Sequence, residues 1–141
     1  MALIHGARGI IYFAHQFKPK FIEAGLLADD EMARAVSALN GQIRELAPVL
    51  NSPDLPNGAS VTSSDPKVPV DFVVKRHEGR TYLFAVAMRD GQTTATFRLP
   101  GQADARVEVL GEGRTIPADG GRWDDRFDGY GVHLYRIAAG R

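Results

Sequence analysis

The sequence predicts a mainly β protein with one long helix: an antiparallel β-sandwich-like domain preceded by a strand–helix unit. Two patterns lead to this fold class. Short segments with apolar and polar residues in alternation, separated by Gly and Pro, fill residues 68–141. A single helical repeat of apolar residues lies before them, in residues 1–50. We therefore expect a strand–helix unit at 1–50, a linker with room for a first strand at 51–67, and the β-sandwich domain at 68–141.

The composition is that of a globular domain and excludes several classes of function. The 141 residues suffice to bury a core, and 17 basic residues balance 17 acidic ones. No nucleic-acid or membrane partner is expected, because either would need a basic surface. The absence of cysteine excludes disulfides, thiolate zinc sites and cysteine nucleophiles. The four histidines lack the spacing of metal ligands, so we expect no metal and no cofactor.

The first element is expected at residues 10–14, which are continuously apolar, β-branched and aromatic. This composition is typical of a strand that is buried on both faces, as in a parallel sheet covered by helices. The side chains of His15, Gln16 and Phe17 follow at the carboxyl end of this strand, and Pro19 ends it.

The helix is the clearest local prediction. Asp29 or Asp30 can cap its first turn, where acidic residues also favour the helix dipole. Proline disfavours the helical conformation of the residue before it, so Pro48 is expected to end the regular helix at about Leu46. Apolar residues at spacings of four and three form one face: Met32, Val36, Leu39, Ile43, Leu46 and Leu50.

The strands of the β-domain follow from alternation and turn residues. Residues 59–63 could form a short strand inside the linker, and residues 70–76 and 81–88 flank a turn at 77–79. The Asp90-Gly91 pair predicts a type I′ hairpin that leads into residues 93–99. Further strands are expected at 105–110, 114–116, 122–127 and 132–137.

Several segments resemble parts of one enzyme class. Residues 2–13 (ALIHGARGIIYF) resemble the last barrel strand of TIM-barrel glycoside hydrolases, and residues 40–50 are similar to the helix that follows it. Residues 82–87 and 127–137 resemble strands of the small antiparallel β-domain that many such enzymes carry at their C-terminus. The resemblance covers nearly the whole chain, in separate pieces.

The resemblance implies that residues 1–50 are a βα remnant of a (β/α)8 barrel and begin at its eighth strand. The paired catalytic carboxylates of such glycosidases lie on earlier strands, which are absent here. It therefore implies a non-catalytic C-terminal accessory domain of a carbohydrate-active enzyme, which is expected to be secreted or periplasmic. The apolar helix face would cover the barrel of the parent enzyme. In this chain it would cover the β-domain or a second copy, which predicts a homodimer through this face or the N-terminal strand.

Two groups of residues are candidates for carbohydrate binding. His15, Gln16 and Phe17 lie where a barrel strand delivers functional groups. The second group combines aromatic rings that could stack on a polysaccharide or oligosaccharide with acids that could accept its hydrogen bonds: Trp123, Asp125, Phe127 and Tyr130. This group makes a carbohydrate-binding module the alternative function. The competing interpretation places Trp123 and Phe127 in the sandwich core and the acids in turns. Calcium binding by these acids is disfavoured, because their spacing is not that of an EF-hand loop.

Overall fold

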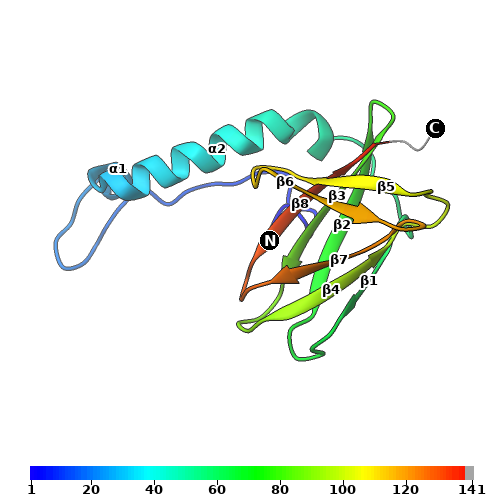
Figure 1. The fold of residues 1–141 in the computed structure, drawn as a ribbon. Coiled ribbons are helices and arrows are strands. Elements are labelled where there is room, and N and C mark those ends of the chain that lie inside the picture. The colour runs from blue at the N-terminus through cyan, green and yellow to red at the C-terminus, as the bar shows by residue number, and fades with distance from the viewer. Residues whose placement is uncertain (139–141) are drawn as a thin grey trace.

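The computed structural model describes residues 1–138, which form a two-sheet β-sandwich with a long helix at one side (Figure 1). All strand pairings are antiparallel, in a five-stranded sheet with the order β2-β3-β8-β5-β6 and a three-stranded sheet with the order β1-β4-β7. This confirms the expected antiparallel, sandwich-like class. The strands are β1 Ser60–Ser63, β2 Val70–His77, β3 Arg80–Ala87, β4 Thr93–Arg98, β5 Ala105–Val109, β6 Arg114–Ala118, β7 Arg122–Phe127 and β8 Val132–Ile137.

The main core lies between the two sheets. On β8, Tyr135 and Ile137 are buried, as the alternation of that segment predicts. The register places Tyr135 opposite Leu83 of β3 in one sheet and Phe97 of β4 opposite Trp123 of β7 in the other. Inward-facing side chains of both sheets thus meet in one apolar layer, which is the arrangement that holds such sandwiches together.

The Asp90-Gly91 hairpin prediction is wrong. The chain bends there, with Gly91 at a φ of 129°, but the bend carries the chain from β3 in one sheet to β4 in the other. Both edges of β3 are already occupied by β2 and β8, so β4 has no edge of β3 to pair with. Turn residues specify a local reversal of the chain, whereas the choice of pairing partner depends on the whole sheet.

The long helix α2 spans Asp30–Leu50 and follows the short helix α1, Gly25–Ala28. Asp29 caps α2 as predicted, because its carboxylate accepts hydrogen bonds from the backbone N–H groups of Glu31 and Met32, both at 3.0 Å. The expected end near Leu46 is wrong, since the helix continues through Pro48. The turn after Pro48 is held by burial of Val49 and by the hydrogen bond from Asn51 N–H to the Ala47 carbonyl, at 2.9 Å.

Only the C-terminal end of α2 packs on the sandwich. Leu46, Val49 and Leu50 join a second apolar cluster with Phe84 of β3 and Leu134 of β8. The rest of the helix extends away from the sheets (Figure 1). Along that part the apolar face is about half exposed, with Met32 47% exposed and Leu39 45% exposed.

The strand expected at residues 10–14 is not formed. These residues are extended, but they pair with no strand of the described chain, and Ile11 is 98% exposed. A strand that is buried on both faces needs neighbours on both edges and helices on both faces. Residues 1–138 give this segment no neighbouring strand, and it contacts α2 where the Tyr12 hydroxyl donates to Asn40 Oδ1 at 2.9 Å. The preceding residues do make contact, because Ile4 packs into the cluster at the end of α2.

Candidate functional site

The two strongest aromatic candidates of the sequence lie inside the sandwich. Trp123 is 3% exposed and Phe127 is 0% exposed. Trp123 stacks on Phe97, with ring centroids 5.1 Å apart and planes 19° apart. Both rings belong to the core, which is the competing interpretation given above, and neither presents a face on which a sugar could stack. Tyr130, in the turn between β7 and β8, is exposed.

Asp125 is also buried, and its carboxylate is fully used by the protein. Oδ1 accepts hydrogen bonds from Arg114 Nη1 at 3.0 Å and from the Arg126 backbone N–H at 2.9 Å. Oδ2 accepts from Arg114 Nη2 and from the Tyr135 hydroxyl, both at 2.8 Å. Burial and the neighbouring carboxylate raise the pKa of Tyr135 well above its ordinary value, so this phenol stays protonated. A sugar or calcium ion could bind Asp125 only by displacing one of these donors.

Glu112 and His133 extend this network, and the sequence pattern did not reveal them. Glu112 Oε1 contacts His133 Nδ1, and Arg114 Nε donates to Glu112 Oε2 at 2.7 Å. His133 Nε2 lies 3.0 Å from the Arg126 carbonyl oxygen. Burial alone would raise the pKa of Glu112, but the hydrogen bonds from His133 and Arg114 outweigh it and hold this pKa below its ordinary value. The network links side chains of β6, β7 and β8, and it therefore stabilises the packing of these strands against one another.

The other three candidates lie in an exposed aromatic loop, which we define as residues 13–21. Its four rings follow one another at centroid distances of 5.6 to 5.9 Å, and the main chain of Gln16 bridges that of Ile22. Gln16 Nε2 donates to the Lys20 carbonyl, at 3.4 Å. The loop reaches past the start of α2, at the end of the molecule away from the sandwich (Figure 1). The rings are those of Phe13, His15, Phe17 and Phe21, and the three phenylalanines are exposed.

The aromatic loop and Tyr130 do not form one surface. Tyr130 lies in a turn of the sandwich, whereas the loop lies beside α1 and the start of α2. The structure therefore divides the predicted binding residues into three places: the core, the sandwich turn and the aromatic loop.

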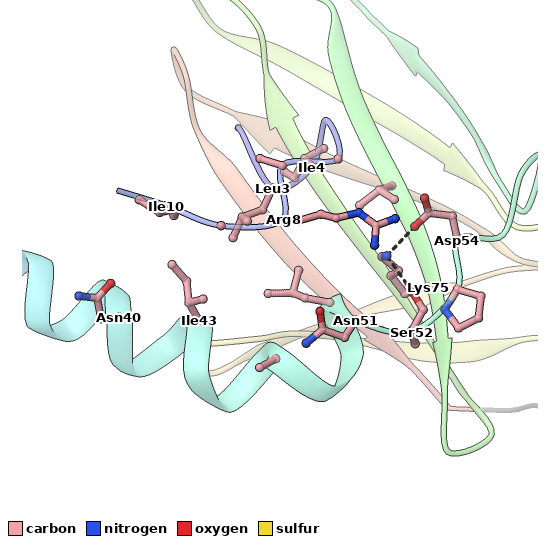
Figure 2. Close-up of a pocket in the computed structure, with 17 residues that line it drawn as sticks. Leu3, Ile4, Arg8, Ile10, Asn40, Ile43, Asn51, Ser52, Asp54 and Lys75 are labelled. Atoms are coloured by element: carbon pink, nitrogen blue, oxygen red, sulfur yellow. Dashed lines mark hydrogen bonds and ion pairs between the residues drawn. The ribbon is translucent and has the colours of Figure 1, made fainter. Parts of the chain in front are cut away.

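A cavity of about 560 Å³ lies between residues 3–10, the second half of α2 and β2 (Figure 2). Its polar wall contains Arg8, Asp54 and Lys75. Lys75 Nζ forms an ion pair with Asp54 Oδ1 at 2.5 Å and donates to the Ser52 carbonyl oxygen at 2.9 Å. No sequence pattern indicates this cavity, because it forms where three segments distant in the chain meet.

Within residues 1–138, no group of three or more His, Cys, Asp or Glu side chains is arranged to hold a metal ion. Over the same residues, no helix has the length and apolar character needed to cross a membrane.

The fold has a counterpart among solved structures. The crystal structure of an Anoxybacillus α-amylase, described as giving insights into a new glycosyl hydrolase subclass, is similar with a TM-score of 0.52 and 18% sequence identity. The match covers 80% of this chain but only 24% of the amylase chain, so this chain spans about a quarter of that enzyme's length. No family model matches the sequence, and no curated protein matches it. The similarity establishes a fold shared with part of a glycoside hydrolase.

Proposed function

We propose that this chain is a non-catalytic C-terminal part of a glycoside hydrolase, and that its helix and aromatic loop pack against the catalytic barrel of that enzyme. One observation carries the proposal. Large apolar side chains are exposed along the aromatic loop and the first half of α2, while the sandwich buries its own core completely.

The pattern of exposure supports a contact with a larger body. Ile11, Phe13 and Phe17 precede α1, and Leu27 and Leu39 lie on the helices, so the exposed residues span one continuous stretch of chain. An apolar area of this extent in solvent is typical of a protein–protein contact. Burial would stabilise each such side chain by about 1.5 to 3 kcal/mol. The fold shared with a quarter of an α-amylase supports a glycoside hydrolase as the larger body.

The first experiment measures association and hydrolysis by the purified chain. We expect the isolated chain to bind the dye ANS and to associate as its concentration rises, and to release no product from chromogenic glycosides. The double substitution Met32→Lys and Leu39→Lys should weaken both association and dye binding without lowering the unfolding temperature of the sandwich, and the aromatic loop should account for what remains. A monomer that binds no dye at any concentration would contradict the proposal, and so would glycoside turnover that survives purification.

The same measurement addresses the homodimer. A dimer of defined mass in light scattering, lost in the double variant, would show that a second copy covers the helix face. Open-ended association would instead show that a single second copy does not cover the exposed face.

A carbohydrate-binding module remains the second candidate, and the aromatic loop is the observation that favours it. Exposed rings at spacings near 6 Å can stack on sugar faces. Affinity electrophoresis in gels of soluble starch, β-glucan, xylan or mannan tests this function. Retardation that Phe17→Ala removes and Tyr130→Ala does not would support binding by the loop. Mobility that no glycan changes would exclude it. Trp123→Ala is unsuitable as a probe, because it would disrupt the core.

A further inference from the structure

The cavity shown in Figure 2 carries more positive than negative charge. The side chains of Arg8 and Lys75 point toward the same end of the cavity, where Asp54 is the single acidic residue of the described wall. Asp54 forms its ion pair with Lys75, and no carboxylate of residues 1–138 forms an ion pair with Arg8. Two cations and one carboxylate leave one positive charge in excess.

This excess charge favours an anionic ligand. Two cationic groups that face one space repel each other, and a negative group between them converts the repulsion into attraction. Lys75 is well placed to take part, because its side chain is only 12% exposed and its ammonium group is fixed by Ser52 and Asp54. Arg8 offers the planar pair of N–H donors that binds carboxylates and phosphates through two parallel hydrogen bonds.

The size and remaining wall of the cavity indicate more than a simple ion. A volume of about 560 Å³ is within the range of small-molecule sites and far exceeds that of one phosphate. Asn51 and Ser52 add polar groups that can bond to hydroxyls, and Leu3, Ile43 and Val73 provide apolar surface for the carbon face of a ring.

The segment that carries Arg8 is held in place at its base. Ile4 packs with Phe84 and Leu134, and the His5 ring bridges two acceptors. His5 Nδ1 lies 3.1 Å from the Met1 carbonyl oxygen, and Nε2 lies 3.0 Å from Asp71 Oδ2 on β2. The wall formed by residues 3–10 is thus fastened to the sheet that carries Lys75.

We propose that this cavity binds a sugar-sized organic anion, a polyhydroxylated compound that bears a carboxylate or a phosphate, with the anionic group between Arg8 and Lys75. The inference does not depend on the proposed function, because it rests on the cavity and not on the exposed aromatic loop or the first half of α2.

The test is isothermal titration of the purified chain with four probes: glucuronate, glucose 6-phosphate, glucose and inorganic phosphate. At least one of the two anionic sugars should bind saturably, and glucose and inorganic phosphate should each bind at least about tenfold more weakly. Binding of glucuronate alone would assign the site to carboxylates, and binding of glucose 6-phosphate alone would assign it to phosphates.

Two variants locate the binding. Arg8→Gln should weaken it by about tenfold or more, whereas Arg98→Gln, a matched change at an exposed arginine of β4 in the other sheet, should leave it unchanged. Circular dichroism should show the same fold for both variants. The proposal is overturned if neither anionic sugar binds, if glucose binds equally well, or if Arg8→Gln binds as tightly as the parent chain. None of these results would alter the association expected from the exposed helix face.

Discussion

Arg114 of β6 and Asp125 of β7 join the edge strands of the two sheets through a pair of hydrogen bonds, at 3.0 and 2.8 Å. A sandwich of two open sheets has free edges, and β6 and β7 follow each other directly in the chain. The bidentate contact closes this side of the sandwich. The Tyr135 hydroxyl binds the same carboxylate from β8, so Asp125 connects three strands.

Removing this carboxylate should destabilise the whole domain. Asp125→Ala leaves the Arg114 guanidinium and the buried Tyr135 hydroxyl without their acceptor, and we expect a loss of about 3 kcal/mol in the free energy of unfolding. Urea denaturation, followed by the fluorescence of the buried Trp123, measures it. The matched change Asp124→Ala removes an exposed acid that accepts one hydrogen bond from Thr96 at 2.6 Å, and it should cost less than about 1 kcal/mol. Equal effects of the two substitutions would refute the anchoring role of Asp125.

Glu112 should make the stability of the domain depend on pH in the acid range. Its folded-state pKa lies below the ordinary value of 4.5, because the hydrogen bonds from His133 and Arg114 outweigh burial. Its contribution is therefore fully present above pH 4.5 and is lost as the pH falls through the folded-state pKa. In Glu112→Gln, the loss of stability relative to the parent chain should be largest at neutral pH and should shrink toward pH 3. Urea midpoints measured between pH 7 and pH 3 test this, and a difference that stays constant over the range would disprove it.

Gly121 and Gly120 should respond very differently to the same substitution. Both have positive φ angles, 76° and 53°, so alanine is strained by about 1 kcal/mol at either position. At Gly121 a Cβ atom would also clash with the Leu99 carbonyl oxygen, whereas at Gly120 nothing lies within 4 Å. Gly121→Ala should therefore lower the unfolding temperature clearly more than Gly120→Ala does. Thermal unfolding of the two variants compares them, and similar temperatures would show that the backbone moves aside without cost.

Val49 should be the residue that attaches α2 to the sandwich. Val49→Ala removes two buried methyl groups from the cluster with Tyr82 and Phe84, and we expect it to cost about 1 to 2 kcal/mol. Leu39→Ala shortens a side chain that is 45% exposed and lies outside the cluster, and it should change the stability of this chain less than Val49→Ala does. Hydrogen exchange of the α2 amides should accelerate in the Val49 variant alone. Exchange that accelerates equally in both variants would contradict this division of the helix.

The strands could be predicted because the pattern that identifies a strand lies within a few neighbouring residues. Each inward-facing residue of β7 and β8 alternates with an outward one, and this spacing is visible in the sequence. The connection at Asp90-Gly91 could not be predicted, because the pairing partner of β4 depends on which strand edges are free. The helix passed through Pro48 because tertiary burial of Val49 opposed the local preference.

The candidate site was predictable only in part. The sequence showed that Trp123 and Phe127 are aromatic, but it could not show which side of the sheet they face relative to the core, so both interpretations stayed open. Arg8 and Lys75 lie 67 positions apart, and nothing in either segment indicates that they share a cavity. The strand expected at residues 10–14 depends on neighbours that residues 1–138 do not supply.

The attachment of α2 at one end has a mechanical consequence. A helix of 21 residues is about 32 Å long, and within residues 1–138 its members of the apolar cluster on the sheets are Leu46, Val49 and Leu50, at its C-terminal end. A pivot of about 10° at that point would sweep the far tip through about 5 Å. A partner that binds the N-terminal end of α2 would therefore set the orientation of the β-domain. Small changes in the angle between α2 and the sheets near Val49 would become large displacements of the aromatic loop.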